Sequence, residues 1–266
     1  MKSSYFGLFK MSFKGEAQYR SKAFSGILTQ LFWGLLSIYL YTAFMRGTVI
    51  DGFSVRQMAT YIWLGQSMFV LRYILLPKNC AKEIENGDVC YKFTRPLDLY
   101  NQWYAEHIGY KIASTLLRSF PIIIIAFLLP GNLRMMLPVS FTAFLLYLVS
   151  LIIGGMIASA IAMITVFLTF KTMSANGTQK IMNTITSILG GMSIPLPLMP
   201  NGVQKVLNYL PFRYIIDLPN RIYIGNIAIK SAIILILISI AWLIALILLG
   251  KLLIKCAART AVIQGG

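Results

Sequence analysis

The chain alternates between long apolar segments and shorter polar ones. Runs near the length that crosses a bilayer, about 20 residues, lie at residues 24–45, 57–77, 108–130, 136–170, 178–199 and 229–254. The pattern predicts an all-α polytopic membrane protein with six transmembrane helices, forming one transmembrane domain over residues 1–266. The fourth run is long enough for a tilted helix with an extension beyond the bilayer, or for a broken helix.

Residues 1–22 are amphipathic and precede the first apolar run. Aromatic residues at helical spacing give an apolar stripe, at Phe6, Phe9 and Phe13. The polar face carries cations, at Lys10, Lys14 and Arg20. Such a helix is suited to the headgroup plane, so we expect an interfacial helix here.

Lysine and arginine are distributed unevenly between the segments that alternate across the six predicted spans. With the N-terminus inside, the inner segments hold roughly twice as many cations as the outer ones. An even number of spans then places both termini in the cytosol. The three cysteines, Cys80, Cys90 and Cys256, also fall inside, where thiols stay reduced, and none has CxxC spacing.

Composition agrees with a membrane protein and argues against a nucleic-acid binder. The chain is 58% hydrophobic with a mean hydropathy of +0.73, and 12% of its residues are charged; about a quarter is usual for soluble domains. Its net charge of +16 comes from cations that punctuate apolar runs instead of clustering on a soluble face. We therefore expect the bilayer, and no nucleic acid, as a partner.

The chain has little chemistry of its own. It lacks a GxxxxGK[ST] phosphate loop, and its single histidine, His107, is expected at the membrane interface. Arg72 is expected to snorkel from the inner end of the second span to the headgroups. The acidic residues fall outside the centres of the apolar runs: Glu16, Asp51, Glu83, Glu85, Asp88, Asp98, Glu106 and Asp217. We therefore expect no catalytic residue and no metal, and no ion-coupled transport by this chain alone.

The polar stretch between the second and third spans, residues 78–107, is the longest cytosolic loop. Charged residues surround Ile84 and Val89 in a pattern that predicts a short amphipathic helix. The helix should end at Gly87 or at the Arg95-Pro96 pair. From the residues alone, such a helix lies either on the membrane surface or in the groove of a partner.

The segment before the last span, residues 195–228, cannot be a simple helix. Pro195, Pro197 and Pro200 interrupt it, and the amphipathic stretch "VQKVLNYL" is too short to span. Irregular backbone at membrane depth must be buried in protein or line a watery cavity. The alternative is an ordinary surface loop with interfacial aromatic residues.

Four blocks resemble the permease subunit of a type-2 ABC exporter, a six-helix class that works as a dimer with separate ATPase subunits. Three of them are "GLFKMSFKGEAQYRSKAF", "YKFTRPLDLYNQWYAEHIG" followed by "LLRSFPIIIIAFLLP", and "SIPLPLMPNGVQKVLNYLPFRYIIDLPNRIYIG". The fourth, "LLGKLLIKCAARTAVIQGG", is a basic cytosolic end to the last helix and is generic. The Arg-Pro-Leu-Asp run is similar to the signature of a bacterial subfamily in which two different permeases usually share one ATPase. The resemblance covers nearly the whole chain.

The resemblance implies roles for three groups of residues. The ATPase-coupling helix and signature would be Glu83, Ile84, Glu85, Asn86, Gly87 and Asp88 with Arg95, Pro96, Leu97 and Asp98. An outer re-entrant hairpin that closes the exit would use Gly190, Gly191, Pro195, Pro200, Pro211 and Phe212. The second and fifth helices would line the pathway with Tyr61, Gln66, Asn183 and Ser187. The alternative for Arg95 and Asp98 is that they pair together, or with headgroups, and fix the bend before the third span.

The resemblance also implies the function. We expect an export permease in the bacterial cytoplasmic membrane that moves a small amphiphile, such as a drug, antibiotic or peptide. ATP and magnesium would be bound by the partner ATPase, and the second permease would be a different chain. Two alternatives remain: export of a lipid-linked polysaccharide, and a polytopic membrane enzyme acting on lipids.

Overall fold

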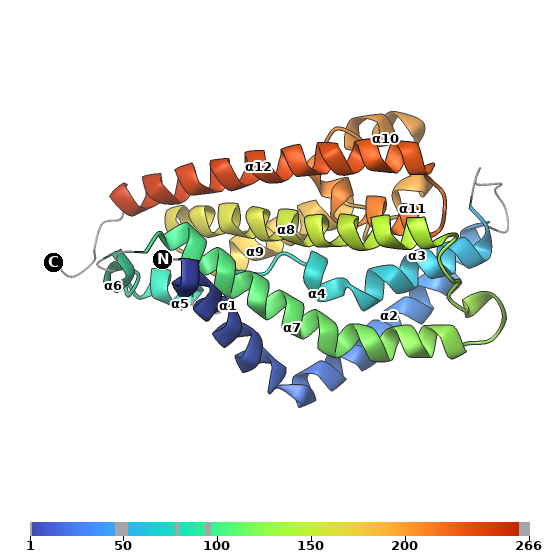
Figure 1. Cartoon of the computed structure of the whole chain (residues 1–266), viewed down its shortest axis with the longest axis horizontal. Coiled ribbons are helices and arrows are strands. Elements are labelled where there is room, and N and C mark those ends of the chain that lie inside the picture. The colour runs from blue at the N-terminus through green and yellow to red at the C-terminus, as the bar shows by residue number, and fades with distance from the viewer. Residues whose placement is uncertain (1, 46–52, 78–79, 94–96, 261–266) are drawn as a thin grey trace.

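The computed structural model describes residues 2–45, 53–77, 80–93 and 97–260, and within them the chain is helical without strands. Four of the described helices are long and apolar enough to cross a membrane. These are α2 (Arg20–Met45), α7 (Leu99–Leu128), α8 (Phe141–Thr172) and α12 (Ile229–Thr260). The helices α8 and α12 run along the long axis of the molecule, whereas α2 is inclined to it (Figure 1). The chain is therefore an all-α, multi-pass membrane protein.

The two other predicted spans form shorter helices. Residues 57–77 contribute α3 (Val55–Ser67) and α4 (Phe69–Arg72), after which the chain leaves the helix. Residues 178–199 contribute most of α9 (Ala175–Leu189). Because none of these reaches the length of a spanning helix, the structure does not establish the number of six crossings. Short α4 lies near the middle of the long axis (Figure 1).

Side chains from other helices hold the backbone where α4 ends. The Asn183 side chain accepts from the Ile74 N–H at 2.8 Å and donates to the Ile74 carbonyl at 2.6 Å. Gln179 accepts from the Leu76 N–H at 3.1 Å, and Lys111 Nζ donates to the Leu71 carbonyl at 3.0 Å. These bonds replace those that a continuing helix would make, and backbone in a bilayer needs such replacement.

The helix α8 is the centre of the fold. It packs against α7, α9, α11 (Asp217–Tyr223) and α12. Its buried side includes Gly154, Gly155 and Ala158, whose small size allows close approach. A Cβ atom on Gly154 would lie 2.7 Å from the Tyr214 carbonyl oxygen. The irregular segment before α11 can therefore lie directly on this helix.

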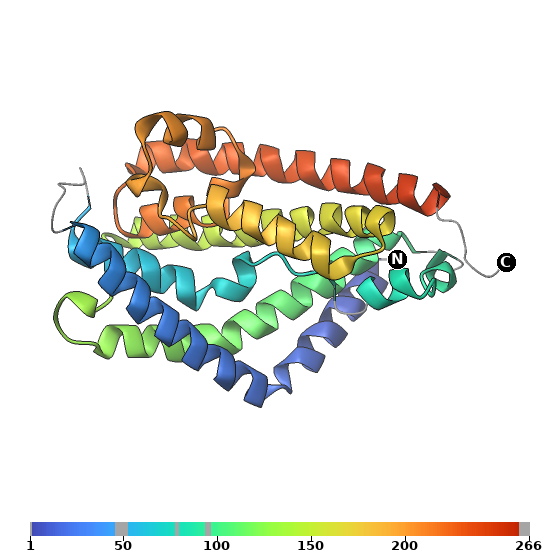
Figure 2. The ribbon, with the colours of Figure 1, turned by 180° about the vertical axis from the view of Figure 1, so that it is seen from behind.

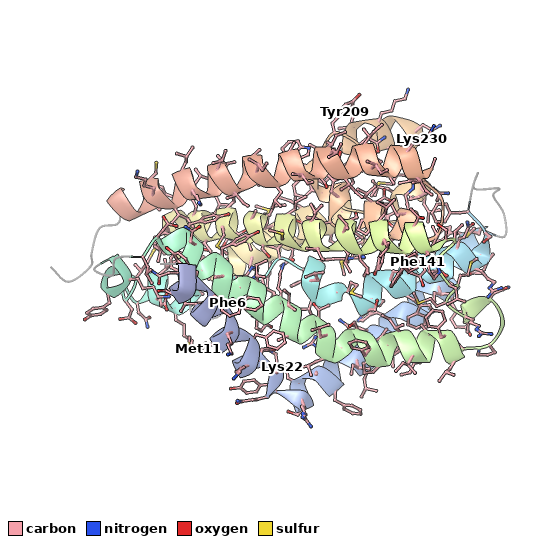
Figure 3. The ribbon with its side chains drawn as sticks, in the orientation of Figure 1. Phe6, Met11, Lys22, Phe141, Tyr209 and Lys230 are labelled. Carbon is pink, nitrogen blue, oxygen red and sulfur yellow. The ribbon has the colours of Figure 1, made fainter. Side chains whose placement is uncertain are left out.

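The predicted N-terminal helix is present as α1 (Lys2–Ala17), packed along α7 and meeting α2 at a sharp corner (Figure 1). Ser12 donates to the Glu106 carbonyl at 2.7 Å. Gly109 leaves room for the α1 backbone, since its Cβ would lie 2.4 Å from the Phe9 carbonyl oxygen. Phe6 and Met11, labelled on α1 in Figure 3, are 65% and 63% exposed, which suits a lipid-facing side.

Apart from α4, most of the short α-helices lie toward the two ends of the molecule. One end holds α5 (Cys80–Glu85) and α6 (Cys90–Phe93), beside the start of α1 and the end of α12 (Figure 1). The opposite end holds α10 (Asn201–Leu207) and α11 (Figures 1 and 2). The remaining short helices are of the 3-10 type: η1 (Gly131–Leu133), η2 (Leu196–Leu198) and η3 (Pro211–Tyr214).

Candidate functional site

The segment from α5 to α6 is a compact turn with an apolar inner side. The helix α5 ends at Glu85, and Gly87 has a φ of 79°, a conformation that glycine adopts without strain. The Val89 N–H then donates to the Glu83 carbonyl at 2.9 Å. Ile84 and Val89 are both 3% exposed. The short helix therefore ends two residues before Gly87, near one of the two ends that the sequence pattern predicts.

Two glutamates of this segment point to other helices. Glu83 Oε2 lies 2.8 Å from Lys92 Nζ and accepts from Trp103 Nε1 of α7 at 3.3 Å. Glu85 Oε1 accepts at 3.2 Å from the N–H of Ala175, the first residue of α9. The segment is thus tied to the beginnings of both α7 and α9.

The opposite side of the same segment is exposed. Lys82, Asn86, Asp88 and Tyr91 are all exposed, and Tyr91 is 75% exposed. We call these four residues the end patch. Of the acidic residues predicted to dock a partner, Asp88 lies on this patch, whereas Glu83 is largely used inside the molecule.

Asp98 of the Arg-Pro-Leu-Asp run caps α7. Its side chain accepts from the Asn101 N–H at 2.9 Å, and its own N–H donates to the Tyr5 hydroxyl at 3.0 Å. The Leu97 carbonyl accepts from the Gln102 side chain at 3.2 Å. These contacts start α7 earlier than the predicted residue 108 and fix the bend there. Arg95 and Pro96 lie outside the described residues.

At the other end, Gly190 and Gly191 end α9 and turn the chain. Gly191 has a φ of 83°. A Cβ on Gly190 would lie 3.1 Å from the Phe212 carbonyl oxygen, so the turn touches η3. The remaining residues predicted for an outer gate begin or precede short helices or pack against the core: Pro195 before η2, Pro200 before α10, and Pro211 and Phe212 in η3.

Three adjoining hollows lie between α2, α3, α9 and the segment after Gly191. The largest of the three in volume, a cavity of about 930 Å³ at the C-terminal end of α2, is lined by Phe44, Phe53 and Gln204 among others. The groove, about 740 Å³, is lined by Trp33 and Ser187 among others. The central pocket has about 30 Å³. All three border on Tyr41, so they form one series.

Three of the four residues predicted to line a pathway border these hollows. Tyr61 lines the central pocket, Gln66 lines both the pocket and the groove, and Ser187 lines the groove. Asn183 does not border them. Its amide is engaged with the Ile74 backbone, as described above.

The sequence-based expectations for Arg72 and His107 are wrong. Both side chains are 1% exposed, so neither reaches the membrane interface. Arg72 Nη2 donates to the Asn220 side chain at 2.7 Å. Arg72 is the last residue of α4, which ends near the middle of the long axis, whereas the hydropathy pattern predicted a span that continued to residue 77.

A buried ionic cluster on α11 was also missed. Asp217 is 0% exposed, and its carboxylate lies 3.5 Å from Arg213 and 3.7 Å from Arg221. The Tyr61 hydroxyl donates to it at 3.3 Å. The available signal was the spacing of Arg213, Asp217 and Arg221, four residues apart each time, although Arg213 belongs to η3 and the other two to α11.

The comparison with protein families decides between the classes of membrane protein that this architecture allows. The sequence model of the ABC-2 family transporter proteins matches residues 28–265, most of the chain. The chain belongs to the ABC-2 transporter family. A comparison with curated proteins found no match. As an ABC-2 permease, the chain is a membrane-spanning transport subunit whose family works with an ATPase partner.

Proposed function

We propose that this ABC-2 permease is the membrane subunit of an ATP-driven exporter and moves a small amphiphile, such as a drug, antibiotic or peptide. A separate cytosolic ATPase binds ATP and magnesium and docks on the 78–100 loop through the end patch. The observation that carries this proposal is the α5–α6 segment, whose one side is exposed and whose other side is bonded to α7 and α9.

The contacts of this segment suggest how ATP hydrolysis is transmitted. A force that the ATPase exerts on the end patch is transmitted through the Glu83–Trp103 contact to α7 and through the Glu85–Ala175 contact to the start of α9. The groove is lined by residues of α2, α3, α9 and neighbouring segments. Movement of α9 relative to α2 therefore changes access to the groove, as expected of a transition between two arrangements.

The same proposal assigns six crossings and an orientation. The fragment α3–α4 with residues 73–77 forms one broken span, and α9 with the turn at Gly191 forms another. Residues 195–228 dip back into the membrane as the outer gate. The end with α5 and α6, together with both termini, faces the cytosol of a bacterium. The excess of cations in the inner segments supports this orientation.

The pathway is completed by a second permease, which we infer to be a different chain of the bacterial subfamily with the Arg-Pro-Leu-Asp run. Two exposed aromatic residues of α2 line the hollows, Phe44 in the cavity of about 930 Å³ and Trp33 in the groove. A partner permease would cover this face of α2.

The rival interpretation, a membrane enzyme acting on lipids, has less support. Such enzymes generally hold a metal or activate a hydroxyl with clustered acidic, histidine or cysteine residues. In the part of the chain that the structure describes, no three such residues come together to hold a metal ion. A lipid-linked polysaccharide is the second candidate cargo, because the groove would also admit a lipid tail.

A photo-crosslinking experiment tests the docking site. Benzoylphenylalanine replaces Tyr91, which is 75% exposed on the end patch, or Tyr209, which is 79% exposed on the opposite end (Figure 3). In native membranes, we expect irradiation at Tyr91 to attach a P-loop ATPase, identified by mass spectrometry, and irradiation at Tyr209 to attach none. An ATPase captured from Tyr209, or from neither position, would overturn the docking site.

A further inference from the structure

We propose that Arg72 is the centre of an anion-binding subsite that takes the carboxylate or phosphate headgroup of an amphiphile. The headgroup enters the central pocket while the apolar tail lies in the groove. This inference rests on the proposed function only for what the bound molecule is for, since the site itself is argued from the geometry of this chain.

The Arg72 guanidinium has free hydrogen-bonding capacity at the pocket. Arg72 lines the central pocket and is 1% exposed. Its Nη2 donates to Asn220, but Nε and Nη1 have no hydrogen-bond partner within the described residues. Buried polar groups are normally paired, and an unpaired guanidinium is a costly exception. A guanidinium N–H donates strong, charge-assisted hydrogen bonds to the oxygens of a carboxylate or phosphate.

The charges around the pocket favour an anion. Among the described residues that line the central pocket, Arg72 is the charged one. Tyr61, which also lines it, donates to Asp217, a carboxylate flanked by Arg213 and Arg221. That carboxylate is shared by Arg213 and Arg221, so no described acidic group pairs with Arg72. An excess of buried positive charge in low-dielectric surroundings attracts an incoming anion strongly.

The shape of the hollows selects an amphiphile instead of a free ion. The central pocket, about 30 Å³, holds only the tip of a headgroup. It shares Ser37, Tyr41, Gln66 and Met192 with the groove, about 740 Å³, so a molecule can occupy both. The groove adds apolar and aromatic walls, Trp33, Leu40 and Phe69. A charged tip and an apolar body are therefore accommodated side by side.

The backbone around Arg72 has a feature of substrate sites in membrane transporters, a helix that is broken beside a cavity. The helix α4 ends at Arg72 near the middle of the long axis (Figure 1), and irregular backbone follows. Broken helices at mid-depth are tolerated where they line a cavity, and transporters place substrate sites at such breaks. A buried ionisable group in that position indicates a functional site.

The subsite is tested with the full chain in phosphatidylcholine nanodiscs and a fluorescent carboxylate probe, dansylaminoundecanoic acid. Displacement by dodecanoate, dodecyl phosphate, dodecylamine and dodecanol is measured, with empty nanodiscs subtracted to remove partitioning. We expect dodecanoate and dodecyl phosphate to displace the probe at concentrations roughly ten- to a hundredfold below dodecanol, as charge-assisted hydrogen bonds imply. Equal displacement by all four compounds would overturn the proposal.

Two variants and one control separate the subsite from general stability. Arg72→Gln removes the charge and should abolish the preference for the anionic compounds. Gly65→Val keeps Arg72 but adds methyl groups beside it, because a Cβ at residue 65 would lie 4.0 Å from Arg72 Nη1. Gly65→Val should also weaken the preference for the anionic compounds. Should Arg72→Gln not fold, the preference measured in Gly65→Val alone tests the subsite. The matched control is Arg118→Gln, on a groove arginine outside the central pocket, which should retain the preference.

Two further comparisons complete the test. Retention of the anionic preference in both Arg72→Gln and Gly65→Val would contradict the assignment. Adding phosphatidylglycerol to the nanodiscs distinguishes the sources: competition assigns the subsite to a bilayer phosphate, and no competition assigns it to a small exported amphiphile. ATPase crosslinking from Tyr91 is scored separately, so the subsite can fail while the exporter function stands, and the reverse.

Discussion

Acidic side chains that lie a few residues apart in the α5–α6 segment have different roles. Glu83 connects Lys92 to the buried Trp103 indole, whereas Asp88 is exposed on the end patch. Reversal of the charge at Glu83 would therefore disturb the segment itself. A loss of ATPase binding after charge reversal at Asp88 would therefore report on the docking surface. The same loss at Glu83 could come from a change in the segment's own structure.

Replacing Glu83 by alanine should destabilise the protein. The change leaves the indole N–H of Trp103, a fully buried residue, without its partner, and an unpaired buried donor costs about 1–3 kcal/mol. The midpoint of thermal unfolding in detergent measures the effect. The matched change Asp88→Ala should stay within about 0.5 kcal/mol, as surface changes usually do. An equal loss in both variants would show that the Glu83 contact contributes nothing.

Cys80 should be unreactive in the folded protein. It is 1% exposed at the start of α5, and burial raises the pKa of its thiol well above the usual value. Since the thiolate is the reactive form, little of it is present at neutral pH. In a Cys90→Ala background, maleimide should label exposed Cys256 and not Cys80 until the protein is denatured, as read by mass spectrometry. Labelling of native Cys80 at a comparable rate would refute this.

At the scale of elements, α1 depends on close packing against α7. Glu16, at its C-terminal end, is 3% exposed and accepts from Ser114 of α7 at 3.2 Å and from Lys22 at 3.3 Å. Ser12 and Gly109 make the contact in the middle of the helix. One face of α1 is therefore fixed along its length.

Gly109→Ala should displace α1. The added Cβ would lie 2.4 Å from the Phe9 carbonyl oxygen, and such overpacking costs about 1–3 kcal/mol. Hydrogen exchange of the α1 amides should become faster, and the unfolding midpoint should fall. Gly7→Ala, where nothing lies within 4 Å of the new atom, is the control and should leave both unchanged. Identical exchange in the two variants would contradict the packing of α1 on α7.

Hydropathy located the four long helices because their hydrogen bonds are local to each helix. The predicted spans at 24–45, 108–130, 136–170 and 229–254 correspond to them, with α7 starting earlier because Asp98 caps it. The spans 57–77 and 178–199 were less well predicted. Their apolar residues satisfy the same pattern, but side chains from α9, distant in sequence, take over the backbone bonds after α4.

The sequence also predicted those parts of the candidate sites that depend on local backbone, but not those that depend on contacts between helices. Gly87 and the outer prolines act on local backbone, so their turns could be read from the residues. The inward role of Glu83 could not, because its partner Trp103 lies on another helix. The burial of Arg72 and Asp217 also depends on packing between distant segments, which no local pattern contains.

At the scale of the whole molecule, the end patch and α10 should face opposite sides of the membrane. Single cysteines at Asp88 and at Lys205, an α10 residue, are introduced into a chain without its native cysteines. In intact spheroplasts, an impermeant maleimide should label only residue 205, and in inverted vesicles only residue 88. Permeabilised membranes control for reactivity at both positions. Labelling of both residues from one side would contradict the proposed orientation.

A separate ATPase that drives this permease should be found by purifying the tagged chain from its native membranes in mild detergent and identifying its partners by mass spectrometry. We expect a P-loop ATPase, accompanied by a second ABC-2 permease. Asp88→Lys should reduce the recovered ATPase, while Lys230→Glu, at the other end of the molecule (Figure 3), should not. Recovery of the intact chain without an ATPase in several detergents would contradict the proposed function.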